Sequence, residues 1–232
     1  MLRKRSDPGE GKPIFVPDAE IDRHARKHSA LGGGKRAFDV VASLLMLILL
    51  SPALLLVAML ILVTLGRPIF FRQQRPGLGG RPFGLIKFRS MANRTGPDGS
   101  PLADEERLGA IGRLLRSTSL DEVPELLNVL RGDMSLVGPR PLLMEYLPLY
   151  SAEQRRRHEV RPGLTGLAQV SGRNALDWEE KFALDVRYVD EWSMALDVRI
   201  LAATLWKVLS WQGISHADHA TAPKFRGNGD EV

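Results

Sequence analysis

The most pronounced hydrophobic pattern along the chain is a long apolar run near the N-terminus. Residues 40 to 66 contain no charged side chain, and only Ser43, Ser51, Pro52 and Thr64 interrupt the apolar sequence. At about 1.5 Å per residue, a helix over this run would be roughly 40 Å long, whereas the hydrocarbon core of a bilayer is about 30 Å thick. A long polar stretch with several acidic residues precedes the run, so it does not have the form of a cleaved signal peptide. The pattern predicts a membrane helix that stays in the mature protein.

The dipeptide Ser51-Pro52 divides this run into two arms. A proline inside a helix removes one backbone donor and clashes with the preceding turn, which costs about 3 kcal/mol. The arms, residues 40 to 51 and 53 to 66, are each about 20 Å long and too short to span a bilayer alone. Basic residues flank the run on both sides: Arg26, Lys27, Lys35 and Arg36 precede it, and Arg67, Arg72, Arg75, Arg81, Lys87 and Arg89 follow it. Because cytoplasmic segments concentrate Lys and Arg, we expect a re-entrant helix with both ends in the cytoplasm, and a kinked single span is the alternative.

Shorter patterns predict the elements that follow. Residues 69 to 73 and 82 to 88 are typical of short strands joined by a glycine-rich turn. Helical patterns cover residues 108 to 115 and 176 to 192, and another helix is expected from about residue 120.

A last apolar face repeats at helical spacing toward the C-terminus. Its members are Leu196, Ile200, Leu201, Leu205, Val208 and Leu209. Trp206 and Trp211 lie beside this face, and Arg199 and Lys207 are near it. The pattern fits a core helix and a helix lying at the membrane interface equally well.

These elements divide the chain into four parts. Residues 1 to 34 are polar and rich in proline, and they end in the triple glycine Gly32-Gly33-Gly34, which predicts a flexible leader with a hinge. Residues 35 to 67 hold the membrane helix, residues 68 to 212 a globular domain, and residues 213 to 232 a loose tail. The predicted fold class is a mixed α/β cytoplasmic domain with one N-terminal re-entrant membrane helix, broken at Ser-Pro, and interfacial amphipathic helices.

Composition narrows the choice of partner. The chain has 232 residues, 44% hydrophobic and 25% charged, so it is neither disordered nor a polytopic membrane bundle. Its formal net charge of +5 indicates an anionic partner, which leaves nucleic acid, a membrane surface and a phosphorylated substrate as candidates. The absence of cysteine excludes disulfides, thiolate metal sites and thiol catalysis.

Candidate chemistry centres on the acidic pair Asp121-Glu122. Ser119 lies three residues before Glu122, as in a capping box, so the two carboxylates can be explained as stabilising a helix start. A helix N-terminus also attracts phosphate and keeps a carboxylate ionised, as a nucleophile or a magnesium ligand must be. Adjacent residues on a helix point about 100° apart, so we expect two separate roles for Asp121 and Glu122.

Basic residues complete a pattern that favours phosphoryl transfer. Arg140 is the most informative of them because Pro139 and Pro141 fix the chain on either side, which would preorganise the guanidinium group for a phosphate. Phosphoryl transfer needs a metal and basic groups to neutralise charge while a carboxylate attacks. The alternative interpretation of each of these arginines is an ordinary surface charge.

In combination and order, the motifs of the chain closely resemble the bacterial sugar transferases, and specifically the small monotopic polyprenyl-phosphate phosphoglycosyl transferases. The motifs are Lys35-Arg36 before the broken apolar run, Lys87 to Met91, Leu115 to Asn128, Asp133 to Pro141, Arg161 to Gly166, Gln169, and Gly172 to Asn174. The resemblance covers residues 35 to 215 and places the catalytic domain of the family in residues 68 to 212.

The resemblance implies a reaction and a location. An enzyme of this family passes a sugar 1-phosphate from a UDP-sugar to a polyprenyl phosphate such as undecaprenyl phosphate and releases UMP, which is the first membrane step of surface glycan assembly. The resemblance also implies that the protein lies at the bacterial inner membrane, with its active site on the cytoplasmic face. The expected partners are the UDP-sugar, the polyprenyl phosphate and the lipid bilayer. No nucleic acid is expected, and a homo-oligomer is left open.

The resemblance also implies roles for individual residues. Asp121 would attack the β-phosphorus to form a phosphosugar-aspartyl intermediate, and Glu122 with Asp121 would hold Mg²⁺. The residues expected to bind substrates are Lys87, Arg89, Arg116, Arg140, Gln169, Arg173 and Asp185. Ser51 and Pro52 match the break of the family's re-entrant helix.

Two alternatives remain open at this point. The chain can be a membrane-anchored basic module that binds acidic lipid or nucleic acid without catalysis, although this leaves Asp121-Glu122 unexplained. The lipid phosphate can also attack the donor directly, with Asp121 only a metal ligand. Which sugar is carried does not follow from the spacing of the motifs.

Overall fold

The computed structural model describes residues 29–100, 102–172, 176–210 and 224–227. The order of its elements is α2 (Ser29–Thr64), β1 (Phe70–Pro76), η1 (Leu78–Gly80), β2 (Pro82–Phe88), α3 (Asp104–Arg107), α4 (Ala110–Ser117), η2 (Leu120–Glu125), α5 (Leu126–Arg131), β3 (Ser135–Val137), η3 (Met144–Leu149), α6 (Ala152–Arg155), η4 (Arg156–His158), β4 (Gly163–Thr165), α7 (Leu167–Ser171), α8 (Trp178–Glu191) and α9 (Met194–Leu209). This mixture of helices and strands confirms the predicted α/β class. Most of the predicted leader and tail lies outside the described residues.

Two small sheets make up the β-structure of the described residues. Strands β1 and β2 form the predicted antiparallel hairpin, in the register Phe70 to Phe88 and Pro76 to Pro82. Gly79 in the turn has a φ of 65°, a left-handed conformation that glycine adopts without strain. Strands β3 and β4 pair in parallel through Ser135 and Gly163.

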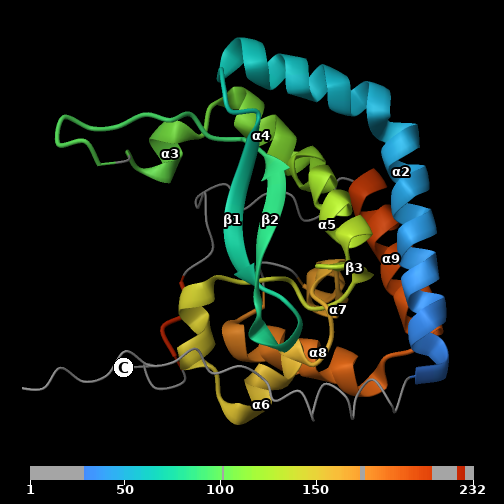
Figure 1. Cartoon of the computed structure of the whole chain (residues 1–232). Coiled ribbons are helices and arrows are strands. Elements are labelled where there is room, and N and C mark those ends of the chain that lie inside the picture. Colours follow the sequence, from blue (N-terminus) through green and yellow to red (C-terminus); the bar gives the residue numbers. More distant parts are fainter. Residues whose placement is uncertain (1–28, 101, 173–175, 211–223, 228–232) are drawn as a thin grey trace, which may run out of the picture.

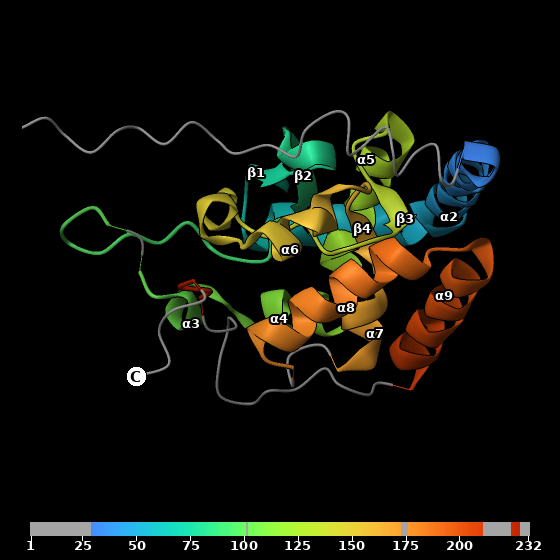
Figure 2. The same cartoon turned by 90° about the horizontal axis from the view of Figure 1, so that it is seen from below.

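The main core lies between the parallel strands and the C-terminal helices. Figures 1 and 2 both show β3 between α5 and α8. The buried cluster there includes Val129 of α5, Leu136 of β3, Tyr188 of α8 and Ile200 of α9. Helix α8 begins with a capping box in which Asp177 and Glu180 bond to each other's backbone N–H, so the predicted helix over residues 176 to 192 is confirmed.

Helix α9 uses its two faces differently. Ile200 is fully buried in the core, whereas the side chains of Leu205 and Trp206 are 60% and 68% exposed. The helix therefore contributes to the core, as one interpretation predicted, and it also leaves an apolar face uncovered; its position at a membrane interface stays a prediction.

Helix α2 is the candidate membrane helix. Among the described residues, Gly33–Thr64 is the segment long and apolar enough to cross a membrane. Helix α2 is bent about midway (Figure 1) and has Pro52 inside it, and proline is the usual cause of a sharp kink. Ser51 Oγ donates to the Ile48 carbonyl oxygen at 2.8 Å, so the carbonyl group four residues before Pro52, which the proline cannot bond, has a partner. Large apolar side chains stay exposed on both arms: Val41, Leu44, Leu45, Ile48, Leu49, Leu55, Leu56, Met59 and Val63.

One sequence expectation at the start of this helix is wrong. Helix α2 begins at Ser29, so the triple glycine Gly32-Gly33-Gly34 lies within the helix and does not form a hinge. Glycine weakens a helix by roughly 1 kcal/mol relative to alanine, but tertiary contacts override such preferences. The contacts made by the residues just after the glycines supply that stabilisation.

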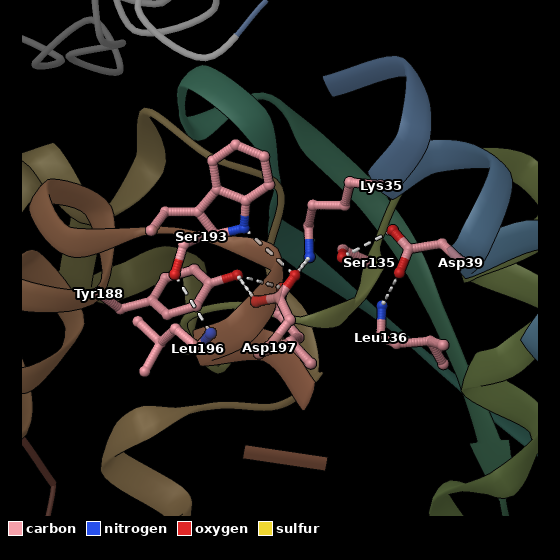
Figure 3. Close-up of polar contacts among 10 residues, drawn as sticks. Lys35, Asp39, Ser135, Leu136, Tyr188, Ser193, Leu196 and Asp197 are labelled. Atoms are coloured by element: carbon pink, nitrogen blue, oxygen red, sulfur yellow. Dashed lines mark hydrogen bonds and ion pairs between the residues drawn. The ribbon is translucent and has the colours of Figure 1, made fainter. Parts of the chain in front are cut away.

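The first arm of α2 is fastened to the globular domain by buried polar contacts (Figure 3). Lys35 Nζ forms an ion pair with Asp197 of α9 at 2.5 Å, and the same carboxylate accepts hydrogen bonds from Tyr188 and Trp192. Asp39 accepts from the Ser135 hydroxyl at 2.8 Å and from the Leu136 backbone N–H at 3.2 Å. Because every one of these groups is at least partly buried, the arm is held in one position.

The second arm of α2 returns to the same domain. Val57 and Ile61 are buried against Phe88 of β2 and Leu115 of α4. Immediately after the helix, which ends at Thr64, the guanidinium group of Arg89 donates to the carbonyl oxygens of Leu65, Gly66 and Arg67. Both ends of α2 are therefore fixed to one globular domain.

Candidate active site

The acidic pair lies on η2, which follows α4 after a sharp turn. Ser119 takes a left-handed backbone conformation with φ of 56°, and its side chain makes no capping hydrogen bond. The backbone N–H of Glu122 donates to the backbone carbonyl oxygen of Ser119 at 3.2 Å instead. The predicted capping box is therefore wrong, and the carboxylates of Asp121 and Glu122 are not occupied by helix capping.

Asp121 is a buried carboxylate among cations. It is 3% exposed, and its Oδ1 atom has no hydrogen-bond partner in the described part of the chain. Burial, and secondly the neighbouring Glu122, raise the pKa of Asp121 to about 6, while Lys87, Arg116 and Arg140 act in the opposite direction. With this pKa most of the group is still ionised at pH 7, as a nucleophile or a metal ligand must be.

Glu122 pairs with Arg140 across a long sequence separation. The two guanidinium nitrogens of Arg140 donate to the two oxygens of Glu122, one of them at 3.3 Å. The negative charge of Glu122 raises the pKa of Arg140. This two-point pair fixes the guanidinium beside Asp121, and it gives Glu122 a partner that competes with a metal ion. Contact of Arg140 with a phosphate, which the flanking prolines led us to expect, stays a prediction.

Lys87 and Arg116 approach the pair from β2 and α4. Burial lowers the pKa of Lys87, and the charge of Asp121 partly offsets this. The Lys87 ammonium lies 5.5 Å from the ring centroid of Phe71, and Arg116 Nε donates to the Ser90 hydroxyl at 3.1 Å. The structure thus brings together Lys87, Arg116, Arg140 and the two predicted carboxylates.

Glu125 is a site residue that the sequence analysis missed. It lies on η2 one turn after Asp121 and Glu122 and is 3% exposed. Burial, and secondly the charge of Glu122, raise the pKa of Glu125. Its spacing of three and four residues from the acidic pair was the available signal, because residues so spaced share one helix face.

Arg89 lies elsewhere among the predicted substrate-binding residues. Its guanidinium group closes the end of α2 through the three carbonyl contacts described above. Contact of Arg89 with a substrate stays a prediction. Arg173 lies outside the described residues.

Gln169 and Asp185 line a cavity that continues from Arg140. The cavity has a volume of about 70 Å³. Its lining consists of Arg140, Leu142, Arg157, Ala168, Gln169, Trp178, Lys181 and Asp185. Asp185 accepts from Arg157 Nε at 3.0 Å and Nη2 at 2.6 Å, and both side chains are buried. The structure therefore places Asp185 in the cavity wall as one half of an ion pair.

The donor set around Asp121 suits a magnesium ion that is held mainly by its substrate. No group of three or more His, Asp or Glu residues in the described part of the chain is placed to hold a metal alone. Magnesium is commonly bound through one or two carboxylates together with substrate phosphates and water. Asp121, with a buried oxygen that has no partner among the described residues, fits that arrangement, whereas Glu122 would have to exchange a hydrogen bond from Arg140 for the metal.

Comparison with known proteins shows the family of the chain. The family model described as bacterial sugar transferase matches residues 31–211. The chain is 54% identical over 196 residues to the uncharacterized sugar transferase EpsL of Bacillus subtilis (strain 168), covering 84% of this chain and 97% of EpsL. It is 45% identical over 186 residues to the UDP-glucose:undecaprenyl-phosphate glucose-1-phosphate transferase of Caulobacter vibrioides, covering 76% of this chain and 70% of that protein. It is also 39% identical over 197 residues to the undecaprenyl-phosphate galactose phosphotransferase of Salmonella typhimurium, covering 77% of this chain and 41% of that protein.

The family model and the named relatives define a sugar-1-phosphate transferase, and the structure adds an apolar helix with both ends fixed to its globular domain. The chain belongs to the bacterial sugar transferase family, as its motifs predicted. Named relatives differ in the sugar they carry, glucose in one case and galactose in another.

Proposed function

We propose that the protein transfers a sugar 1-phosphate from a UDP-sugar to undecaprenyl phosphate in two steps through Asp121. The observation that carries this proposal is the buried carboxylate of Asp121, with one oxygen free of hydrogen bonds among the described residues and with three cations around it. A carboxylate held in this way has a free lone pair to attack with. The surrounding cations favour the negative charge that builds up on a transferring phosphoryl group.

The first step forms a bond between an Asp121 oxygen and the β-phosphorus of the donor. The bond from that phosphorus to the oxygen bridging the two phosphates breaks, and its electron pair leaves with UMP. In the second step an oxygen of the lipid phosphate attacks the same phosphorus, and Asp121 leaves as a carboxylate. Dividing the transfer in this way lets a water-soluble donor and a lipid acceptor use one pocket in turn.

The other residues of the site hold phosphate oxygens during both steps. Lys87 and Arg116 face the Asp121 carboxylate, and Arg140 is fixed beside it by Glu122. A bound Mg²⁺ would be held by Asp121 and Glu122 together with donor phosphates, where it would neutralise charge on the diphosphate. Glu125 adds a buried carboxyl group behind the pair, and because its pKa is raised it carries less negative charge there than an exposed glutamate would.

We further propose that α2 is re-entrant and that the site faces the cytoplasm at the inner membrane. Both ends of α2 are bonded to the same globular domain, through Lys35 and Asp39 at one end and through Arg89 at the other. A straight crossing would carry one of these ends to the opposite side of the bilayer. The bend at Pro52 and the basic flanks on both sides support the same topology.

Labelling of single cysteines tests this topology. The chain contains no cysteine, so Ser6→Cys and Thr95→Cys variants would each carry one reactive thiol without background. We expect a membrane-impermeant maleimide to label both variants in inverted inner-membrane vesicles and neither in intact spheroplasts. Labelling of the two positions from opposite sides would contradict the re-entrant helix, and the native chain serves as the unlabelled control.

Release of UMP tests the proposed reaction. The full-length protein in detergent or nanodiscs is incubated with undecaprenyl phosphate and each member of a panel of UDP-sugars that includes UDP-glucose and UDP-galactose. We expect magnesium-dependent UMP release that EDTA abolishes, with one donor strongly preferred. If folded protein releases no UMP from any UDP-sugar, the chain is better described as a membrane-anchored basic module, whose vesicle binding should fall steeply with salt.

A further inference from the structure

The cavity beside Arg140 contains more positive charge than its own carboxylates balance. Three of its lining residues are cations: Arg140, Arg157 and Lys181. Arg140 is paired with Glu122, and Arg157 is paired with Asp185. Lys181 forms no ion pair with a described residue, so it is the cation whose charge remains available in the cavity wall.

The acidic residues nearest to Lys181 in sequence are used in a different contact. Asp177 Oδ1 accepts from the Glu180 backbone N–H at 2.7 Å, and Glu180 Oε2 accepts from the Asp177 backbone N–H at 3.1 Å. These two carboxylates cap the first turn of α8 and influence Lys181 only through space. An anion in the cavity would therefore meet little competition for the Lys181 ammonium.

Trp178 fixes the direction of the lysine side chain. The Lys181 ammonium lies 4.8 Å from the ring centroid of Trp178, within the range of a cation–π contact. The indole is itself held in a cluster of rings: it stacks on Phe182 at a centroid distance of 5.7 Å and meets Tyr146 edge to face. A lysine that is ordered before binding loses less conformational entropy when it contacts a ligand.

Gln169 gives the cavity a second group suited to a polar ligand. Its Oε1 atom is buried and has no hydrogen-bond partner in the part of the chain that the structure describes. An acceptor left in this state is costly unless a ligand N–H or hydroxyl satisfies it. The cavity thus combines an unbalanced cation with an unused acceptor, which matches a ligand carrying both a phosphate and a polar ring system.

We propose that Lys181 binds the α-phosphate of the UDP-sugar, the phosphate that leaves with UMP, and that Trp178 is the residue that positions Lys181. Arg140 lines the cavity and is bonded to Glu122, the neighbour of Asp121, so the cavity begins where the attacked β-phosphorus must lie. The α-phosphate is the next group along the donor. This inference rests on the proposed function, and it assigns the nucleotide half of the donor to the side of Arg140 away from η2.

Binding of UMP tests the inference without requiring turnover. Isothermal titration of UMP into the full-length protein would compare the native chain with Lys181→Met, Lys181→Arg and Trp178→Leu. A charge-assisted phosphate contact predicts that Lys181→Met raises the Kd for UMP by at least about tenfold. Trp178→Leu should raise the Kd by about threefold to fivefold, and Lys181→Arg should keep most of the native affinity.

Arg187→Met is the matched control, because Arg187 lies on the same helix in an exposed pair with Glu191. The Arg187→Met variant should bind UMP as the native chain does.

Steady-state kinetics separate the two halves of the reaction. We expect Lys181→Met to lower kcat/KM for the UDP-sugar by the same factor and to leave kcat/KM for undecaprenyl phosphate unchanged, because UMP has left before the acceptor reacts. Native affinity for UMP in a folded Lys181→Met variant, or a loss confined to the acceptor, would overturn the inference while leaving the proposed function intact. A native protein that neither binds UMP nor releases it would overturn both.

Discussion

Replacing Asp121 with asparagine is expected to lower kcat for sugar phosphate transfer by at least about 1,000-fold, because the amide cannot form the covalent intermediate. The same change should not destabilise the protein. Burial raises the pKa of Asp121, which means that the ionised form is less favourable in the folded state than in water. We therefore expect the melting temperature of Asp121→Asn to equal or exceed that of the native protein, so that lost activity cannot be ascribed to unfolding.

A single-turnover measurement distinguishes covalent attack from direct attack by the lipid phosphate. Without acceptor, the native protein should release about one UMP per active site and retain the labelled sugar phosphate on the chain. Asp121→Asn should show neither the burst nor the adduct. A native protein that releases UMP only when undecaprenyl phosphate is present would favour direct attack and would leave Asp121 as a metal ligand.

Replacing Asp185 with asparagine is expected to lower the free energy of unfolding by about 3 kcal/mol. The side chains of Asp185 and Arg157 are 5% and 1% exposed, so the substitution leaves a buried guanidinium without its counter-charge. Hydrogen bonds from Arg157 to Tyr150 Oη and to the Arg140 carbonyl oxygen remain, but neither partner carries charge. Chemical denaturation of the variant and the native protein would measure the loss.

A matched control is available on the same helix. Asp190 pairs with Arg156 at the surface, where its side chain is 48% exposed, so Asp190→Asn should change the free energy of unfolding by less than about 1 kcal/mol. Removing both members of the buried pair should recover part of the stability lost in Asp185→Asn. If Asp185→Asn instead leaves stability unchanged and raises only the KM for the donor, Asp185 contacts substrate and the structural interpretation is wrong.

The buried pair of Arg157 with Asp185 also supports the candidate active site. Its guanidinium bonds the backbone carbonyl oxygen of Arg140, whose side chain holds Glu122 beside Asp121. A protein that loses the Asp185 charge is therefore expected to lose part of its activity as well, through a displaced Arg140.

Local pattern was sufficient where neighbouring residues decide the conformation. The hairpin followed from two short strands around a glycine turn, and α8 followed from its helical pattern. Local pattern failed at Ser119, where the spacing of a capping box is present but the left-handed backbone turns the side chain away. The prediction of a hinge at the triple glycine was wrong for the opposite reason. Contacts made by Lys35 and Asp39 keep this weakly helical segment in α2.

The amino-acid sequence by itself determined the family and the apolar helix that contains Pro52, and it made Asp121 the candidate nucleophile. These depend on residue order and on a hydrophobic run that no soluble segment of such length would carry. Only the tertiary structure decided which charges meet: Glu122 with Arg140, Asp185 with Arg157, and Lys35 with Asp197. The members of each pair are far apart in the chain, so their contact depends on how the helices pack, and the available charge of Lys181 appears only once these pairs are known.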